Sequence, residues 1–333
     1  MMIYGLIFPL SCLYLRIPKL RGIQCLLLIV ILTLSGCSMF SSDQANRAQR
    51  HDAFDTSNSM ANLIIPEPVE ASGRAQQALA KFNMIVMSPE LSDDERAQFL
   101  FRRGLLFDSV GLSSLAFYDF QQAVRFDPRL HEAYNSIGIH HTVRKEYIEA
   151  YEAFDAVLEM DENYEFTYLN RGVALYYAGR SDLALADIQR YYDNDPQDAY
   201  RLLWLYLVQF EVNPDTAMAL LKKGEVHLTS NQWSDNIVAF YTGKISQQSL
   251  LNSVIVGVDT RNQMNERLCE AYFYLGKYFR QFGKDKIATN FFKLALSTNV
   301  YEFVEHRFSS VELALIRDKN VQVDATNRLP DSE

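Results

Sequence analysis

Three evenly spaced glycines constrain the fold of this chain more than any other feature. They are Gly104, Gly138 and Gly172, and other residues repeat with them at fixed offsets. A small residue and then a large apolar one follow each glycine at the same two intervals, in the pairs Ala116 and Phe120, Ala150 and Phe154, and Ala184 and Ile188. A period of about 34 residues indicates one supersecondary unit repeated along the chain.

This period and this order of large and small residues are typical of the tetratricopeptide repeat (TPR), a helix-turn-helix unit that stacks into a solenoid. The glycine and the alanine are predicted to be packing residues, because the two helices of a unit cross there with their backbones close together. The chain is therefore predicted to be all-α, and substituting Gly104 by leucine is expected to destabilise it.

The repeat frame weakens in the middle of the chain and then returns. In the next unit the bulky Tyr206 stands where the repeat glycine is expected. Gly276 and Ala288 then restore the frame, slightly more than three periods after Gly172. We interpret the stretch between as two degenerate helical hairpins. A final amphipathic helix, about Phe303 to Ile316, is expected either to cap the open end of the stack or to fold back along its groove.

The N-terminus has the pattern of a lipoprotein signal peptide. The apolar run Ile23–Leu34 follows basic residues and is too short to span a bilayer comfortably. The ending Leu-Ser-Gly-Cys resembles the bacterial lipobox, in which Cys37 is acylated, with palmitate among the acyl groups, and becomes the mature N-terminus. Ser38 in the next position favours sorting to the outer membrane. A plain secretory leader or an N-terminal transmembrane helix is the alternative interpretation.

Composition shifts and helical periodicity divide the whole chain into eight segments. These are a signal peptide (1–36), a flexible tether (37–73), an N-terminal helix (74–91), three TPR repeats (92–198), degenerate TPR-like hairpins (199–268), a further TPR repeat (269–300), a C-terminal helix (301–318) and a disordered tail (319–333).

Charge and cysteine content argue against nucleic-acid binding and against a disulfide-based fold. The leader holds three of the 32 basic residues and none of the 41 acidic ones, so the rest of the chain has a net charge of −12. No basic block is available to bind a nucleic-acid backbone. Cys269 is the only thiol after Cys37, so no disulfide framework is expected, and we interpret it as a small packing residue.

No pattern of catalytic, metal-binding or cofactor-binding residues is present. His140 and His141 are adjacent and diverge by about 100° on a helix, so they are not expected to chelate one metal ion. The cluster Glu305, His306 and Arg307 is interpreted as helix capping and surface pairing. The sequence therefore predicts a protein that is not an enzyme and binds no cofactor or metal.

The remaining candidate for function is the inner face of the stack. The residues predicted to face this groove are more apolar than a solvated helix face requires, so they either pack against the last helix or hold a partner. The set lacks the lysine and asparagine residues that clamp a chaperone's terminal carboxylate. The candidate groove residues are Phe101, Leu105, Asp108, Asn135, Ile139, Phe166, Leu169, Val173 and Tyr176.

Several stretches resemble the lipoprotein NlpI family of enteric and related bacteria. They are LSDDERAQFLFRRGLLFDSVGL from residue 91, AYEAFDAVLEMD from 150, LNRGVALYYAGR from 169, FYLGKY from 273 and FVEHR from 303. The resemblance covers about Ser92 to Ile316 and includes turn residues that a generic TPR does not share. The leader and the tether before Ser92 are longer than in the family.

The resemblance implies an outer-membrane lipoprotein that faces the periplasm, forms a homodimer and has no enzymatic activity. Such proteins are adaptors that bind peptidoglycan endopeptidases and a periplasmic tail-specific protease, and so regulate cell-wall growth and cell division. A different class remains open, that of a structural assembly lipoprotein such as a pilotin or a component of outer-membrane protein assembly. An enzyme acting on glycan or peptide is a third hypothesis.

Overall fold

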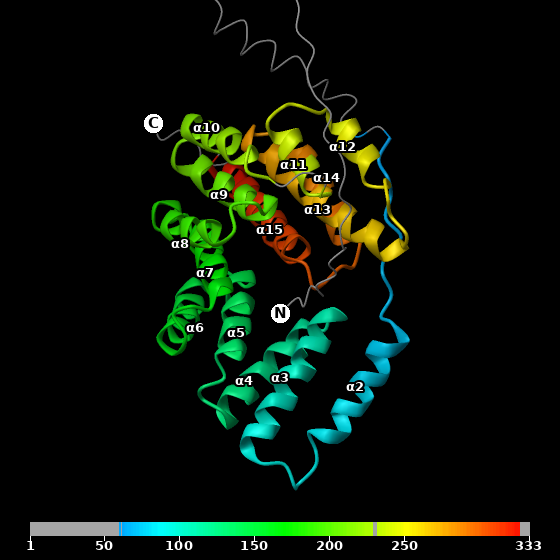
Figure 1. Cartoon of the computed structure of the whole chain (residues 1–333), viewed down its shortest axis with the longest axis vertical. Coiled ribbons are helices and arrows are strands. Elements are labelled where there is room, and N and C mark those ends of the chain that lie inside the picture. Colours follow the sequence, from blue (N-terminus) through cyan, green and yellow to red (C-terminus); the bar gives the residue numbers. More distant parts are fainter. Residues whose placement is uncertain (1–59, 61, 229–231, 327–333) are drawn as a thin grey trace, which may run out of the picture. The chain divides into compact units, whose positions relative to one another are not determined.

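The structure, a computed structural model, describes Met60, residues 62–228 and residues 232–326, with side chains as far as residue 321. The leader, Cys37, Ser38 and most of the expected tether lie outside the described residues. All regular secondary structure in the described part is helical (Figure 1). The helices are α2 (Gly73–Ile85), α3 (Asp93–Ser109), α4 (Ser113–Phe126), α5 (His131–Val143), α6 (Tyr147–Met160), α7 (Glu165–Tyr177), α8 (Ser181–Asn194), α9 (Ala199–Val212), α10 (Pro214–Glu225), α11 (Asp235–Tyr241), α12 (Gln247–Ser253), α13 (Arg261–Gln281), α14 (Asp285–Leu296) and α15 (Val304–Thr326).

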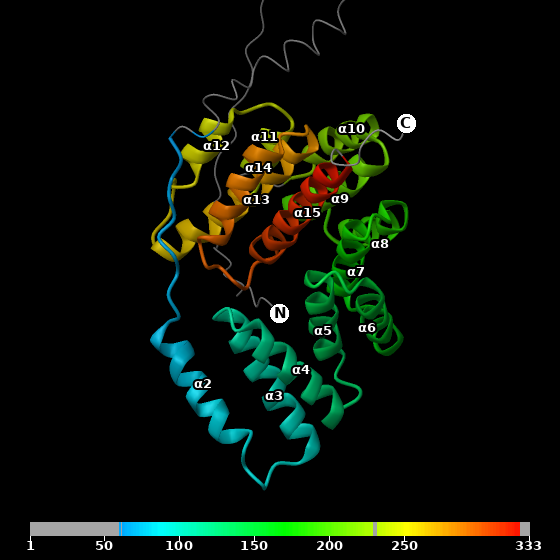
Figure 2. The ribbon, with the colours of Figure 1, turned by 180° about the vertical axis from the view of Figure 1, so that it is seen from behind.

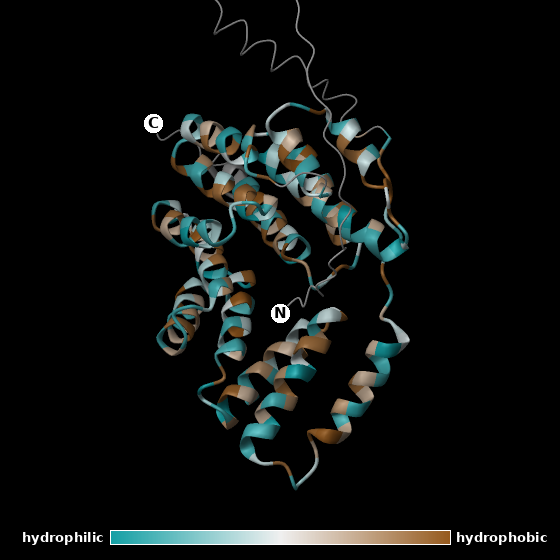
Figure 3. Cartoon of the chain, viewed as in Figure 1, coloured by the Kyte–Doolittle hydropathy of each residue, from teal (hydrophilic) through white to brown (hydrophobic). Residues whose placement is uncertain are grey.

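Consecutive helices pair into antiparallel hairpins, as the repeat period predicts. The expected three repeats in 92–198 are the hairpins α3–α4, α5–α6 and α7–α8, and the later repeat is α13–α14. Apolar and polar residues alternate along most of these helices (Figure 3), so each helix buries one face against its neighbours. The all-α TPR fold is confirmed.

The periodic glycines leave room for a large side chain of the partner helix. A Cβ at Gly104 would lie 2.6 Å from the Phe120 ring, and one at Gly138 would lie 2.5 Å from the Phe154 ring. Real Cβ atoms do not approach other atoms so closely, so an added methyl group would displace the ring. The same pairing joins Gly172 to Ile188 and Gly276 to Phe292, and the alanines of the frame, Ala116, Ala150, Ala184 and Ala288, are fully buried.

A second glycine series marks the turn inside each hairpin, two helical turns after the first series. Gly111, Gly179 and Gly283 have φ angles of +80°, +73° and +69°, a conformation that suits glycine because a Cβ is unfavourable there. Lys145 occupies the equivalent position of the second repeat with φ +64°. The turn geometry is therefore retained where the glycine is not.

The starts of the two helices in the first repeat differ. Helix α3 begins with a capping box, because the Ser92 hydroxyl accepts from the Glu95 amide and the Glu95 carboxylate accepts from the Ser92 amide. Helix α4 instead follows Leu112, whose side chain offers no cap. Its first two amides, those of Ser113 and Ser114, have no hydrogen-bond acceptor among the described residues.

Part of the expected tether is held against the last repeat. The Glu67 carbonyl accepts a hydrogen bond from Asn265 at 2.5 Å, and the Ile64 carbonyl accepts one from the Tyr272 hydroxyl. The Val69 amide donates to the carbonyl of Thr298 at 3.0 Å. Residues 63–70 therefore lie along α13 and the end of α14, and the prediction of a flexible segment up to residue 73 is wrong for this part.

The degenerate middle of the chain replaces the glycine packing by a reversed pair. Leu202 on α9 is the large residue, and a Cβ added to Gly224 on α10 would lie 2.3 Å from its side chain. Tyr206, at the position that glycine occupies in the regular repeats, is buried against Phe210 and Tyr241. One hairpin, α9–α10, is thus preserved by a different pair of residues, and the short helices α11 and α12 follow it.

The last helix is longer than the sequence predicts and packs against several parts of the chain. Helix α15 continues to Thr326, so the first residues of the expected tail are helical, and the boundary at 318 is wrong. It contacts α13, α14 and the distant α5 (Figures 1 and 2). This helix determines which part of the inner face remains open.

Candidate protein-binding site

Helix α15 folds back onto the inner face formed by α7, α9 and α13. The Phe308 ring stacks on Tyr177 with centroids 4.9 Å apart and meets Trp204 edge-on at 6.4 Å. Glu312 is fully buried and accepts hydrogen bonds from the Tyr177 hydroxyl at 3.0 Å and from Lys277 at 2.5 Å. Of the two placements considered from the sequence, the structure therefore has the helix folded back.

The candidate groove residues divide into two groups around α15. In the second half of the groove, Leu169 and Val173 are buried, and the Tyr176 hydroxyl accepts a hydrogen bond from Lys277 at 2.6 Å. In the first half, Leu105 and Ile139 keep part of their surface accessible. Helix α15 thus covers the inner face at the end of α7 and along α13 and also contacts α5, while Leu105 and Ile139 stay partly accessible.

Two of the candidate residues pack outside the groove. The ring of Phe101 is buried within the first hairpin, 5.8 Å from the Phe120 ring. Phe166 is 42% exposed and lies beside the rings of Tyr164 and Tyr191, each 6.3 Å away. Phe101 therefore belongs to the core of the first repeat, against which Leu105 also packs.

Asn135 connects two repeats by hydrogen bonds. Its side-chain oxygen accepts from the Thr167 hydroxyl at 3.3 Å and from the Asn170 amide at 3.1 Å. Because Asn135 is buried, these partners offset the cost of removing its amide from water. Its function in the structure is to fix α5 against α7.

Asp108, another candidate residue, links the first repeat to the last helix. Its carboxylate lies 3.0 Å from Nε2 of His140 on α5 and 3.3 Å from a terminal nitrogen of Arg307 on α15. The Arg307 Nε also donates to the Tyr301 carbonyl at 3.1 Å. The carboxylate is buried, so these contacts compensate its desolvation and hold the start of α15 near α3 and α5.

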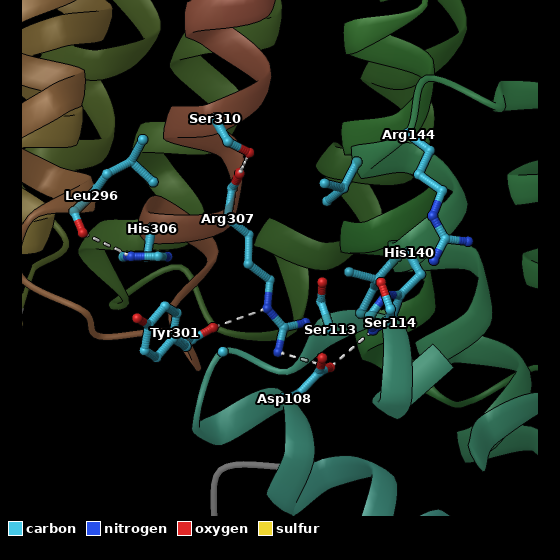
Figure 4. A pocket seen from close by; sticks show the side chains of 13 residues that line it. Asp108, Ser113, Ser114, His140, Arg144, Leu296, Tyr301, His306, Arg307 and Ser310 are labelled. Atoms are coloured by element: carbon cyan, nitrogen blue, oxygen red, sulfur yellow. Dashed lines mark hydrogen bonds and ion pairs between the residues drawn. The ribbon is translucent and has the colours of Figure 1, made fainter. Parts of the chain in front are cut away.

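A cavity of about 310 Å³ lies where these elements meet (Figure 4). Figure 4 shows Arg144, His140 and the serines of α4 on one side, and Tyr301, His306 and Arg307 on the other. Burial lowers the pKa of His306, whose Nε2–H donates to the Leu296 carbonyl at 3.0 Å, so this imidazole stays neutral at neutral pH. The lining residues are Asp108, Gly111, Ser113, Ser114, Ile139, His140, Val143, Arg144, Leu296, Tyr301, His306, Arg307 and Ser310.

The sequence did not indicate this cavity, because its walls come from the first two repeats and from the distant end of the chain. Arg307 was assigned to capping and surface pairing together with Glu305 and His306, but Glu305 and His306 are buried and Arg307 reaches Asp108. Tyr301 and Arg144 carried no signal, since neither stands at a diagnostic repeat position.

The adjacent histidines have separate partners. His140 is buried against Asp108, whereas His141 pairs with Glu146 at 2.7 Å. Among the described residues, no three His, Cys, Asp or Glu side chains are grouped closely enough to hold a metal ion. Within the same residues, no helix combines the length and the apolar character needed to cross a membrane.

No protein-family model matches the chain. Its solved structural neighbours include a tetratricopeptide repeat protein from Parabacteroides merdae, with a TM-score of 0.45 and 17% identity over 74% of this chain and 78% of that one. Another is YrrB, a TPR protein with an unusual peptide-binding site, with a TM-score of 0.39 and 15% identity over 72% of this chain and 97% of that one. The MamA protein has a TM-score of 0.41 and 16% identity over 52% of this chain and 88% of that one. Similarity at this level says nothing about function.

Proposed function

We propose that the chain is a protein-interaction adaptor that binds partner proteins with the part of its inner face that α15 leaves open. The observation that carries this proposal is the division of that face. Buried aromatic and charged contacts hold α15 over α7 and α13, while Leu105, Ile139 and the cavity beside Asp108 remain accessible. Grooves and pockets that combine apolar walls with a few polar groups commonly bind ligands and peptide segments.

The proposed location is the periplasmic face of the outer membrane. The signal-peptide pattern, Cys37 in its lipobox-like ending and Ser38 after it support this location. An acyl anchor would confine the adaptor to a surface without a membrane-spanning helix. A Cys37→Ala variant is expected to leave the membrane fraction with its repeats folded, and its retention there after peripheral proteins are stripped would contradict the anchor.

The proposed partners are peptidoglycan endopeptidases and a tail-specific protease, and the proposed role is control of cell-wall growth and division. The stretches that resemble the NlpI family support these partners. An adaptor that binds both proteins raises the effective concentration of substrate at the protease and needs no catalytic groups of its own.

The same resemblance supports a homodimer, and α2 offers a surface for it. None of its residues is buried, and Met84 of α2 and Met87 just after it are 78% and 79% exposed. Apolar side chains exposed in this way are a common feature of protein interfaces. Light scattering of the purified protein measures whether it is a dimer.

The adaptor function is tested by co-purification with a matched pair of variants. Ile139→Glu places a charge at a half-buried side chain that lines the cavity and also packs against the core of the second repeat. Ile148→Glu places one at a site that is already 70% exposed, and circular dichroism confirms that both variants are folded. We expect the unmodified protein and Ile148→Glu to retain a wall endopeptidase or the tail-specific protease, and Ile139→Glu to lose them. Recovery of neither enzyme, or enrichment of integral barrel proteins instead, would refute this function.

A further inference from the structure

The cavity beside Asp108 carries a positive charge that the protein itself does not neutralise. Among the residues that the structure describes, Asp108 is the only carboxylate in its wall, and it is already engaged by His140 and Arg307. Arg144 has no carboxylate partner among the described residues. Arg144 is exposed to solvent at the wall of the cavity, and its guanidinium is stacked 3.8 Å above the centre of the Phe117 ring.

The same wall offers hydrogen-bond donors without acceptors. Ser113 and Ser114 line the cavity (Figure 4), and their amides, which begin α4, have no acceptor in the described part of the chain. Amides at the start of a helix favour a negatively charged acceptor because the helix dipole adds to their own. They complement the unpaired guanidinium, which is the principal attraction for an anion here.

The opposite wall is apolar and the space is small. Ile139, Val143, Leu296 and the Tyr301 ring line the cavity together with the polar groups. Its volume of about 310 Å³ is at the lower end of the range for ligand sites, about 300–1,000 Å³. This volume suits the end of a chain better than a segment that passes through, and it places an apolar surface beside the anion-binding groups.

We propose that this cavity binds the C-terminal carboxylate of a partner polypeptide whose last side chain is apolar. Arg144 and the amides of Ser113 and Ser114 bind the carboxylate, and Ile139, Val143 and Leu296 contact the terminal side chain. Arg307, held by Asp108 and Tyr301, closes the cavity from α15. This inference rests on the proposed protein-binding function and specifies the part of the partner that is recognised.

A chain terminus satisfies both walls at once, which an internal acidic residue does not. The carboxylate and the last side chain are attached to the same Cα atom, so a charged group and an apolar group enter the cavity together. An internal aspartate or glutamate would also bring main chain on both sides of it into a space of this size. The charges that recognise the carboxylate come from the turn after α5 and the start of α4, outside the groove-facing helix positions.

The test measures binding of fluorescein-labelled hexapeptides to the purified protein by fluorescence polarisation. The peptides end in Ala, Val, Leu or Phe and are made in two forms, with a free C-terminal carboxylate and with a C-terminal amide. A third set carries an internal glutamate and an amidated end. We expect at least one free acid to bind about tenfold more tightly than its amide and than the internal-glutamate peptide, as expected for one charge-assisted contact.

Matched variants assign the effect to the cavity. Arg144→Met removes the charge and keeps an unbranched side chain over Phe117, and it is expected to weaken binding of the free acid about tenfold and to abolish the preference over the amide. Arg102→Ala removes an equal charge from an exposed position of α3 outside the cavity and is expected to change neither. Circular dichroism confirms that each variant is folded before its binding is compared.

Equal binding of acid and amide, preference for the internal glutamate, or an unchanged preference in Arg144→Met would each overturn the proposal. The outcome is separable from that of the adaptor function. If co-purified partners remain bound to the Arg144→Met protein and are lost from Ile139→Glu, the groove binds proteins and the cavity does not recognise their C-termini.

Discussion

The hairpins α3–α8 and the part of the chain from α9 to α15 are stabilised by different kinds of contact. In the first region every hairpin pairs a glycine on its first helix with a large side chain on its second helix, and the second region repeats this pair in α13–α14. An arginine–aspartate pair adjoins it in two repeats, with Arg103 on Asp119 at 2.6 Å and Arg171 on Asp187 at 2.7 Å. Each hairpin thus carries its own stabilising contacts.

The second region depends on contacts between distant residues. Glu312 on α15 is bonded both to Lys277 on α13 and to Tyr177 at the end of α7, and all three are buried. Large polar rings, among them Tyr206 and Tyr274, fill its interior. The comparison suggests that the first region tolerates change repeat by repeat, whereas the second folds as a unit that requires α15.

The largest effect is expected from breaking the buried ion pair of α15. Glu312→Leu leaves Lys277 without its counter-charge in a place where its side chain is 3% exposed, and Arg280 loses the same partner. A single broken buried pair costs about 3–5 kcal/mol. We expect a loss of that order in the free energy of unfolding, measured by urea denaturation.

The double variant Lys277→Met, Glu312→Leu is the control, because it removes both charges and keeps similar volumes. It is expected to recover most of the stability lost in the single variant. If the double variant is as unstable as Glu312→Leu, the packing of the side chains and not the buried charge holds α15 in place.

A smaller loss is expected from one glycine of the regular region. Gly138→Ala places a Cβ 2.5 Å from the Phe154 ring, which must move within a closed hairpin. Overpacking of this kind costs about 1–3 kcal/mol. Gly73→Ala is the control, since no atom lies within 4 Å of its Cβ position and alanine favours a helix. Equal melting temperatures for both variants would contradict the packing role of the repeat glycines.

The contrast between the regions also explains what the sequence predicted. Partners that lie within one repeat return at the same interval in the next, so the three hairpins and the packing of Gly276 were predictable. The cavity beside Asp108 was not, because Arg307 is joined to it by a fold-back of α15 that no periodicity encodes. The reversed pair of Leu202 and Gly224 was also missed, since its small residue lies on the second helix.

A pair of buried carboxylates makes the second region sensitive to pH. Burial raises the pKa of Glu270 and that of Glu305 above the usual 4.5, and the negative charge of Glu305 raises that of Glu270 further. Asp198, Glu266 and the tyrosine rings of α9 and α13 adjoin them and add no positive charge. Both carboxyls therefore hold their protons more tightly in the folded chain than in the unfolded one.

Because these pKa values are raised in the folded chain, the contribution of the two carboxyl groups to stability is fully present below about pH 4.5. This contribution to stability is lost as the pH rises toward 8. Glu270→Gln keeps an acceptor for the indole N–H of Trp233, which lies 2.6 Å from the native carboxylate, and removes one titration. It is expected to stabilise the protein on the order of 1–2 kcal/mol at pH 8 and little at pH 5. If the free energy of unfolding depends on pH in the same way in both proteins, this role of Glu270 is excluded.

The smallest effect is expected where the two regions meet at the turn of the second repeat. Lys145 holds φ +64° at the position that glycine occupies in the other repeats, and its ammonium pairs with Asp318 of α15 at 2.6 Å. A non-glycine residue costs up to about 1 kcal/mol in this conformation, while exposed ion pairs contribute little. Lys145→Gly is therefore expected to raise the melting temperature slightly, and Lys145→Ala, which keeps the strain and loses the pair, to lower it. A lower melting temperature for Lys145→Gly would mean that this contact with α15 stabilises the chain by more than the turn strain costs.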